Sequence, residues 1–275
     1  MRAAACRVLL TGASGGIGSA AAAQLLSAGA SVMLTGRSPA GLSAQARDLM
    51  REYGVDRERV EWHAADLAGV SSPAAITAMA DAAALWRCNT LIHAAGVPAF
   101  GRVESLAAQD IAAVLHLNLF VPMLLTQALL GHLHGQAQSQ VIFIGSVLGR
   151  IGLPGYSVYS AGKFGLRGFS ESLRRELAGS HIRVQYLGPR GTRTAFNSAA
   201  VEQYNDDTHS AMDSPAVVAR ALLQMLESGQ AERFLGFPEK VAVRLNGLAP
   251  TLLDGAFERH RRSLLDSHSL MNNTQ

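Results

Sequence analysis

The chain has 275 residues, of which 48% are hydrophobic and 16% charged, and its formal net charge is +3. It is long enough for one large α/β domain or two small ones, with a sizeable core. The arginines are scattered, no basic run resembles a nucleic-acid-binding arm, and aromatic residues make up only 6%, so we expect no nucleic-acid partner.

The cysteine pattern predicts a reducing compartment. Cys6 and Cys88 do not form a disulfide framework, and residues 1–6 do not read as the apolar part of a signal peptide, so we expect a cytoplasmic protein. No run of about 18 uninterrupted apolar residues occurs, which predicts no membrane-spanning helix. His132 and His134 are two residues apart, unsuited to one helical face, and we expect no metal site.

A strand, a glycine-rich turn and a helix open the chain. The strand is Arg7–Leu10, the turn runs from Thr11 to Gly18, and an alanine-rich helix covers residues 19–28. Gly12 permits the tight turn, Gly16 lets backbone N–H groups approach a pyrophosphate, and Gly18 lets the helix pack close to the sheet. This context favours nucleotide binding over a merely structural turn.

The second strand, residues 30–35, ends at Gly36 and Arg37. Dinucleotide-binding folds that prefer NAD have an acidic residue here, which takes the ribose hydroxyls. A guanidinium instead pairs well with a 2′-phosphate. We therefore expect NADP rather than NAD, although Arg37 could also be a solvated residue at a strand end.

Further helices and strands alternate through the middle of the chain. We expect a helix at 42–53, a strand at 60–64, a helix at 71–86 and a strand at 90–96. A long helix at 103–133 follows and carries Asn118 inside an apolar segment. A buried asparagine needs hydrogen-bond partners. It could be a structural bridge or part of a proton relay.

The fifth strand, Val141–Ile144, leads into the stretch that carries the chemistry. Ser146 follows the strand, and Tyr159 and Lys163 lie one helical turn apart on a helix that runs to about Ala178. A phenol beside a fixed positive charge has a pKa lowered toward working pH, which makes Tyr159 a candidate general acid/base. Only Lys163 and Lys240 are lysines among the 24 basic residues. Taken alone, the pair could be an ordinary helix-surface pair.

The remaining elements complete an α/β pattern. We expect a sixth strand at 181–187, a polar segment at 195–213 that could form a mobile lid, a helix at 214–228, a seventh strand at 233–237, and two helical pieces in 238–270. The alternation predicts a doubly wound parallel sheet of about seven strands with helices on both faces. We expect a single domain at 1–237 and a helical extension at 238–275 that packs on it or projects from it.

Together these motifs resemble the short-chain dehydrogenase/reductase family, a Rossmann-fold family, over residues 6–237. Asn118, Ser146, Tyr159 and Lys163 match its four catalytic positions in order and spacing. The resemblance implies a cofactor site, shared in part with the catalytic residues, at Gly12, Ser14, Gly16, Ile17, Gly18, Arg37, Asp66, Leu67, Ala94, Ala95, Gly96, Tyr159, Lys163, Pro189, Thr192 and Thr194.

Three departures from the family pattern matter. His93 replaces the usual Asn before Ala94, a position that mainly steadies the sheet. Arg190 replaces the usual Gly after Pro189, which bears on the local turn. The ending common in tetrameric members is absent, so a homodimer through the helices at 103–133 and 157–178 is the expected assembly.

The resemblance implies an NADP(H)-dependent oxidoreductase that interconverts a carbonyl and an alcohol, with hydride transfer and Tyr159 as the acid or base. Ser146 would orient the carbonyl, Lys163 would lower the Tyr159 pKa and bind the nicotinamide ribose, and Asn118 would complete a proton relay. A non-catalytic NADP-binding regulatory protein is the alternative. Apolar residues beside the site suggest a lipophilic or acyl-chain ketone as the substrate: Val147, Leu148, Ile151, Leu153 and Phe196. These residues could instead pack the core.

In the extension, apolar residues from Val241 to Leu265 interleave with Arg244, Arg259, Arg261 and Arg262. Such a basic amphipathic segment can lie on a membrane surface or cover a partner. It can also pack on its own subunit.

Overall fold

The computed structural model describes residues 1–69 and 72–272, which build a seven-stranded parallel sheet in the order β3-β2-β1-β4-β5-β6-β7. The strands are β1 (Arg7–Leu10), β2 (Ser31–Gly36), β3 (Val60–Ala64), β4 (Thr90–His93), β5 (Ser139–Ile144), β6 (Ile182–Gly188) and β7 (Glu232–Phe234). The strand order reverses between β1 and β4, and a crevice forms at such a switch point, outside the carboxyl ends of the strands. The predicted fold class is confirmed.

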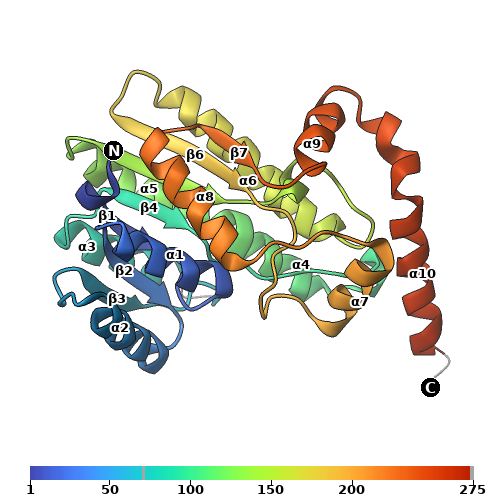
Figure 1. Cartoon of the computed structure of the whole chain (residues 1–275), viewed down its shortest axis with the longest axis horizontal. Coiled ribbons are helices and arrows are strands. Elements are labelled where there is room, and N and C mark those ends of the chain that lie inside the picture. Colours follow the sequence, from blue (N-terminus) through green and yellow to red (C-terminus); the bar gives the residue numbers. More distant parts are fainter. Residues whose placement is uncertain (70–71, 273–275) are drawn as a thin grey trace.

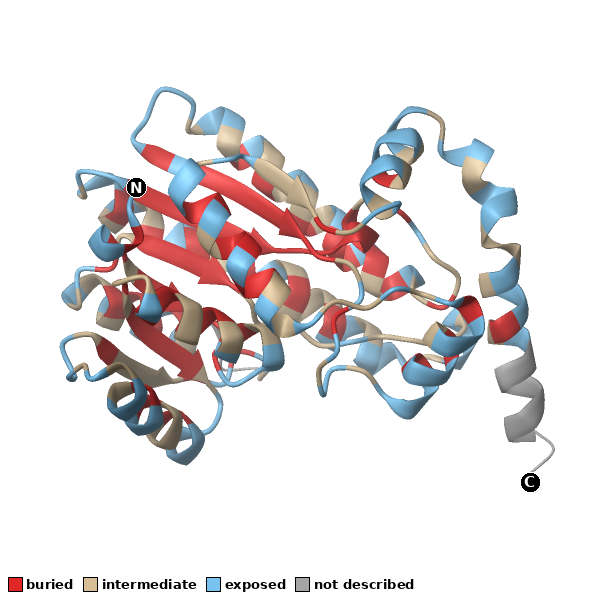
Figure 2. Ribbon diagram, in the orientation of Figure 1, coloured by how far each residue is buried: buried red, intermediate tan, exposed pale blue. Residues whose placement is uncertain are grey.

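Helices cover both faces of the sheet (Figure 1). On one face lie α1 (Gly16–Ser27), α2 (Pro39–Tyr53) and α8 (Pro215–Ser228). The other face carries α3 (Ser72–Leu85), α5 (Val121–His134) and α6 (Ser157–Glu176). Because both faces are covered, the central strands are almost wholly buried, which explains the apolar runs Leu91–Ile92 in β4 and Val141–Ile144 in β5 (Figure 2).

Local signals fix several element ends. The Ser38 side chain accepts a hydrogen bond from the Gly41 N–H at 3.1 Å, Pro39 begins α2, and Gly54 ends it in the left-handed conformation. Other boundaries differ from the predictions: α1 begins at Gly16 rather than residue 19, β4 ends at His93, and β7 covers residues 232–234. The predicted helix start at position 71 lies outside the described residues.

The long helix predicted at 103–133 is three consecutive pieces in the structure. A short 3₁₀ turn (Val103–Ser105) precedes α4 (Ala108–Leu115), a π-helical turn (His116–Phe120) and α5. By length and composition residues 108–134 could cross a membrane, although they contain no run of about 18 uninterrupted apolar residues. In the fold, α5 buries Leu125, Leu129 and Leu133 against the sheet.

The polar segment at 195–213 contains a helix, α7 (Ala199–Thr208), which the sequence prediction missed. Ser198 caps it by accepting a hydrogen bond from the Val201 N–H, and Val201, Tyr204 and Thr208 are buried on one face. Their spacing of three and four residues is a helical signal in a segment of otherwise polar composition.

Beyond β7 the chain forms α9 (Glu239–Leu248), a 3₁₀ segment η5 (Pro250–Phe257) and α10 (Glu258–Asn272). These elements lie at one end of the molecule, and most of their residues with described burial are exposed (Figure 2). The inner side of α10 contacts α7, where the Ser263 hydroxyl donates to the Asp207 carboxylate at 2.9 Å.

Candidate active site

A cavity of about 930 Å³ opens at the carboxyl ends of the strands. Loops that follow β1, β2, β3, β4, β5 and β6 all contribute to its wall. Its volume is at the upper end of the range for ligand pockets. Of the predicted site residues, all line this cavity except Asp66 and Asn118.

The glycine-rich turn after β1 forms one end of the cavity. Gly12 has a φ of +66°, and a Cβ there would lie 2.7 Å from the Ala95 backbone, so only glycine fits. A Cβ on Gly18 would strike the Gly12 carbonyl. The Thr11 hydroxyl accepts hydrogen bonds from the Ala94 and Ala95 N–H groups, both at 3.1 Å, and so joins the loops after β1 and β4.

The N-terminus of α1 begins in this turn. Gly15 caps the helix without a side-chain hydrogen bond, and Gly16 starts it. Unpaired N–H groups at a helix start attract anions such as phosphate. This end of the cavity therefore suits a pyrophosphate.

Arg37 and Asp66 lie in different positions relative to the cavity. Arg37 lines it beyond β2, and no carboxylate among the described side chains lies within ion-pair distance of it. Asp66 is exposed, and its carboxylate accepts a hydrogen bond from the Ala68 N–H at 3.0 Å. Ala65, Leu67 and Ala68 form the wall there instead.

Ser146 follows β5 and is buried at the cavity. Its hydroxyl oxygen accepts a hydrogen bond from the Leu148 N–H at 3.0 Å. Because that bond uses a lone pair of the oxygen, the hydroxyl proton remains available to a ligand.

Tyr186, on β6, fixes the backbone of Ser146 through two hydrogen bonds, and the sequence analysis missed this residue. The Ser146 N–H donates to the Tyr186 phenol at 3.1 Å, and the phenol donates to the Ser146 carbonyl at 3.0 Å. The ring fills the space where a Cβ on Gly145 would lie, and its hydroxyl does the same at Gly149. Only the small residues on either side of Ser146 hinted at this contact.

Tyr159 faces the cavity from the first turns of α6. Its pKa is raised above the ordinary value because burial disfavours the phenolate, while the Ser146 side chain opposes this shift in part. The predicted lowering of this pKa by Lys163 is therefore wrong for the protein alone. The phenol holds its proton at neutral pH.

Lys163 is almost fully buried, with 5% of its surface exposed. Its ammonium donates to the Ile144 carbonyl at 3.2 Å and lies 5.7 Å from the centroid of the Tyr159 ring. Burial lowers the Lys163 pKa to about 8. Among the described residues, no carboxylate pairs with the Lys163 ammonium. Its charge is therefore buried without a counter-ion, which lowers the stability of the folded protein.

Asn118 lies in the π-helical turn between α4 and α5 and is buried. Its side chain donates to the Val97 carbonyl and accepts from the Val97 N–H, both at 2.9 Å. A Cβ on Gly96 would come within 3.0 Å of the Asn118 amide oxygen and 3.9 Å of the Lys163 ammonium. The structure thus supports the structural-bridge interpretation of Asn118.

The two departures at His93 and Arg190 have structural explanations. The His93 ring stacks on Phe143 at 4.9 Å between centroids, and its Nε2 lies 2.9 Å from the Thr126 hydroxyl. Burial lowers the His93 pKa to about 3, so this ring stays neutral inside the fold. Arg190 forms ion pairs with Asp213 at 2.9 Å and Glu239 at 3.4 Å, and so ties the loop after β6 to α9.

The far end of the cavity is apolar and aromatic. The residues predicted to surround a substrate lie there: Val147, Leu148, Ile151, Leu153 and Phe196. Of these, Val147, Leu148 and Ile151 are buried in one cluster with Val243 of α9. Tyr204 of α7 donates to the Pro154 carbonyl at 3.0 Å and lies 2.8 Å from Nδ1 of His260 on α10. The extension therefore forms part of the cavity wall, which the sequence could not show.

Comparisons with known proteins show what the chain is similar to. The family model described as "short chain dehydrogenase" matches residues 7–205. Dehydrogenase/reductase SDR family member 7B from Bos taurus is 31% identical over 258 residues, which cover 89% of this chain and 78% of the relative.

Solved structures match as well. A short-chain dehydrogenase from Sphingobium yanoikuyae in complex with NADPH is 28% identical, with a TM-score of 0.77 and 95% of each chain covered. A short chain dehydrogenase/reductase from Burkholderia phymatum in complex with NAD is 22% identical, with a TM-score of 0.80, 92% of this chain and 96% of that chain covered. This second match bears on the fold alone.

Proposed function

This chain belongs to the short-chain dehydrogenase family, and we propose that it is an NADP(H)-dependent oxidoreductase that interconverts a carbonyl and an alcohol. One observation carries the proposal. Ser146, Tyr159 and Lys163 face the same cavity whose other end is the glycine-rich turn at the start of α1. A phosphate-binding end and a proton-donating end in one cavity are what a nicotinamide-dependent reductase requires.

The residues present fit a dinucleotide. Gly12 and Gly96 both line the cavity, and a Cβ there would lie 2.7 Å from the Ala95 backbone and 3.0 Å from the Asn118 amide oxygen, respectively. The start of α1 would hold the pyrophosphate, Arg37 the 2′-phosphate, and Lys163 the nicotinamide ribose. Arg37 without an acidic neighbour supports NADP over NAD, as does the NADPH in the Sphingobium relative. When bound, NADPH supplies the hydride that reduces the substrate carbon.

The protein groups handle the oxygen and its proton. The Ser146 hydroxyl, whose oxygen already accepts from Leu148, donates a hydrogen bond to the substrate carbonyl oxygen. Tyr159 transfers its phenolic proton to that oxygen as the alcohol forms. Burial raises the Tyr159 pKa, so the phenol carries the proton that this step needs at neutral pH.

Lys163 and Asn118 support the proton donor. The Lys163 ammonium stabilises the phenolate left after proton transfer, and it is still protonated at neutral pH because its pKa is about 8. Asn118 holds the end of β4 beside Lys163 through Val97. Its participation in re-supplying the proton stays a prediction.

The substrate that the cavity supports best is a lipophilic ketone or aldehyde. Apolar and aromatic side chains form its far end, including Leu153 and Phe196 from loops and Phe257 from η5. Burying such surface contributes about 25 cal/mol per Å² of apolar area, so an alkyl or acyl chain would gain affinity there.

The test is Tyr159→Phe, which removes only the hydroxyl. We expect carbonyl-dependent NADPH oxidation to fall by at least a hundredfold, while NADPH binding, measured by fluorescence titration, is unchanged. Tyr53→Phe, at the end of α2 and outside the cavity, is the matched control. Near-wild-type turnover by Tyr159→Phe would reject the mechanism.

A screen with NADPH and NADH against aldehydes, steroids, quinones and 3-oxoacyl thioesters separates the enzyme from the alternative. A protein that binds NADPH but oxidises it with none of these substrates would favour the non-catalytic, regulatory function.

We also propose a cytoplasmic homodimer. Phe120, Met123 and Phe164 are partly exposed apolar residues on the helices where a dimer was predicted. Cys6 and Cys88 are both buried free thiols, as suits a reducing compartment. Light scattering measures the mass in solution, and Phe120→Asp should shift it toward the monomer.

A further inference from the structure

An exposed apolar stripe runs along the outer side of α9 and into η5. It consists of Phe237, Val241, Leu245, Leu248 and Leu252. Val241, Leu245 and Leu248 follow one another at intervals of four and three residues, so they share one side of α9, and Phe237 comes just before the helix. Phe237, Leu248 and Leu252 are exposed by 78%, 85% and 82%, which is high for large apolar side chains.

The inner side of α9 already has its partners. Val243 is buried against Val147, Leu148 and Ile151, and the Asn246 amide donates to the Arg150 carbonyl at 2.7 Å. Packing on the subunit therefore fixes α9 in place but leaves the apolar stripe pointing outward.

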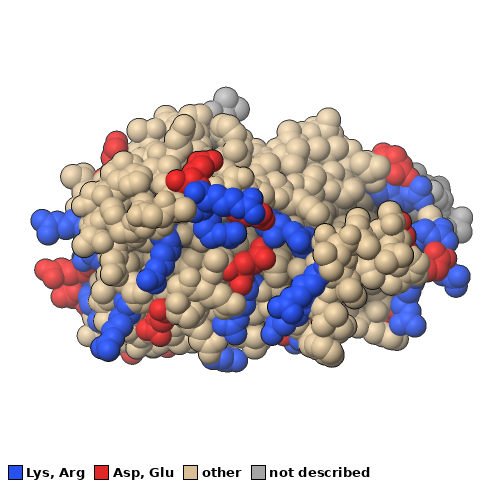
Figure 3. All heavy atoms as spheres, turned by 90° about the horizontal axis from the view of Figure 1, so that it is seen from above, with Lys and Arg blue, Asp and Glu red and all other residues tan. Residues whose placement is uncertain are grey.

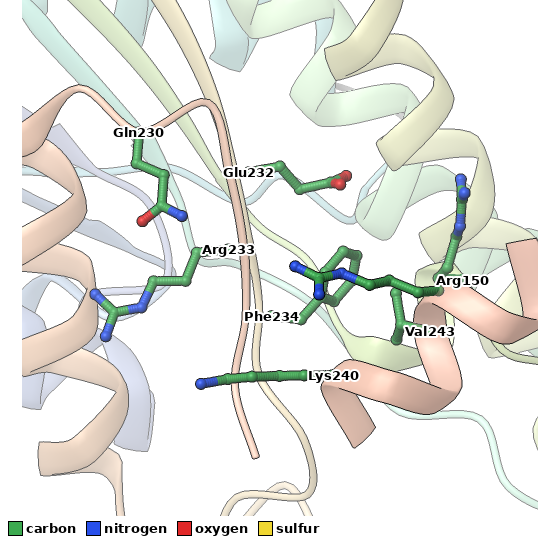
Figure 4. A pocket seen from close by; sticks show the side chains of 8 residues that line it. Arg150, Gln230, Glu232, Arg233, Phe234, Lys240 and Val243 are labelled. Carbon is green, nitrogen blue, oxygen red and sulfur yellow. The ribbon is translucent and has the colours of Figure 1, made fainter. Parts of the chain in front are cut away.

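A basic pocket of about 330 Å³ adjoins the stripe. Arg150, Arg233, Lys240 and Arg244 line it together with Glu232 and uncharged residues. Figure 4 shows Lys240 from the start of α9 and Arg233 from β7 extending toward the same side. Seen from above, Lys and Arg side chains gather in the middle of the molecule, with a few Asp and Glu side chains among them (Figure 3).

Among the described residues, most of the positive charge of this pocket has no carboxylate partner. Glu232 is paired with Arg167 at 2.7 Å, and Glu239, the acidic residue of α9, is paired with Arg190. Within the described part of the chain, Arg150, Lys240 and Arg244 have no carboxylate within ion-pair distance. Arg233 donates only to the neutral Gln224 side chain, at 2.9 Å.

We propose that the stripe and the basic pocket together dock this protein on an anionic phospholipid membrane. The pocket would take lipid phosphates while the stripe enters the boundary between headgroups and acyl chains. This inference does not rest on the proposed enzymatic function. A second copy of the chain fits less well, because a two-fold contact through this face would bring two uncompensated basic pockets together.

The test is co-sedimentation of the full chain with vesicles of phosphatidylcholine, alone or mixed with phosphatidylglycerol. We expect binding to the mixed vesicles and little to phosphatidylcholine alone. Lys240→Gln/Arg244→Gln should bind the mixed vesicles about thirtyfold more weakly, which corresponds to about 2 kcal/mol for two charges near the surface. Leu248→Asp/Leu252→Asp should bind them at least tenfold more weakly.

Matched controls come from the other end of the molecule. Leu85→Asp changes a leucine of α3 that is 86% exposed, and Arg47→Gln/Arg51→Gln removes two exposed charges one turn apart on α2. Both should bind vesicles like the wild type, and thermal unfolding checks that every variant is folded.

Four results would overturn the proposal. The first is no binding to anionic vesicles, and the second is equal weakening by the control variants. The third is loss of binding with the charge variant alone, together with displacement by glycerol phosphate or inorganic phosphate, which would identify a small-anion site. The fourth is a lack of vesicle binding combined with a dimer that the stripe variants convert into a monomer. This result would assign the face to a second copy of the chain.

Discussion

The Tyr186 phenol is hydrogen-bonded to both backbone groups of Ser146, accepting from its N–H at 3.1 Å and donating to its carbonyl at 3.0 Å. The two residues are 40 positions apart and meet because β5 and β6 are neighbours, with Phe143 opposite Tyr186. A buried side chain on one strand thus sets the position of the group that is to orient the substrate carbonyl.

The first prediction is that Tyr186→Phe lowers kcat about tenfold through a small displacement of Ser146. The variant leaves two buried backbone groups with one partner fewer, so we also expect a loss of about 1–3 kcal/mol in the free energy of unfolding. NADPH affinity should not change, since Tyr186 does not line the cavity. Steady-state kinetics, NADPH titration and urea unfolding measure the three quantities.

Tyr53→Phe again serves as the control for loss of a phenol. If Tyr186→Phe weakened NADPH binding as much as it lowered kcat, the residue would be acting on the fold at large rather than on Ser146.

The second prediction concerns the cost of burying Lys163. Its pKa is about 8 in the folded protein and 10.5 in its unperturbed state, so at neutral pH the protonated form is penalised by about 3 kcal/mol. Lys163→Met removes this penalty but also the hydrogen bond to Ile144, about 1 kcal/mol. We expect the variant to be inactive yet more stable than the wild type by about 2 kcal/mol at pH 7.

The stability difference between wild type and Lys163→Met should depend on pH. Below about pH 8 the lysine is charged in both states and the penalty is complete. Between about pH 8 and 10.5 the unfolded state binds the proton that the folded state has lost, so the wild type gains stability as pH rises. The advantage of Lys163→Met should therefore shrink over that range in urea unfolding. A constant difference between pH 7 and 10 would contradict it.

The sequence predicted the fold and the positions of the cavity residues wherever the signal was local. The glycine-rich turn and the strands each occupy a short stretch with a clear pattern, whereas the spacing of Tyr159 and Lys163 became informative only together with the other motifs. The four consecutive apolar residues Val141–Ile144 of β5, for example, indicate burial whatever lies next to them.

Contacts between distant segments could not be predicted in this way. The glycines on either side of Ser146 leave room for a close neighbour but do not identify it as Tyr186. No residue near Arg190 in the sequence indicates that Asp213 and Glu239 are its partners. The Tyr159 pKa could not be predicted for the same reason. The direction of its shift depends on whether burial outweighs nearby charge, and burial depends on the whole fold. The α10 helix lines the cavity through His260, which lies 2.8 Å from the Tyr204 hydroxyl of α7, a contact between segments 56 residues apart.

The third prediction tests the bridge made by Arg190. Arg190→Gly restores the residue usual in the family but leaves Asp213 and Glu239 without their partner. We expect a loss of about 1–3 kcal/mol in the free energy of unfolding and a severalfold higher KM for the carbonyl substrate, because α9 lines the cavity through Ala242. Arg190→Lys should recover part of both, since an ammonium keeps the charge but not the planar fork. Unchanged stability in both variants would mean that the ion pairs contribute nothing.

The fourth prediction is that Arg37 sets the choice of cofactor. Arg37→Asp removes a guanidinium that would pair with a 2′-phosphate and supplies a carboxylate that would accept hydrogen bonds from the ribose hydroxyls. Loss of one charge-assisted contact, about 1.5–3 kcal/mol, corresponds to a ten- to hundredfold higher KM for NADPH, while the KM for NADH should fall. Arg47→Asp makes the same change in charge on α2, outside the cavity, and should leave both values near those of the wild type. The ratio of kcat/KM for the two cofactors is the decisive measurement, and a ratio equal in wild type and Arg37→Asp would show that the cofactor preference is set elsewhere.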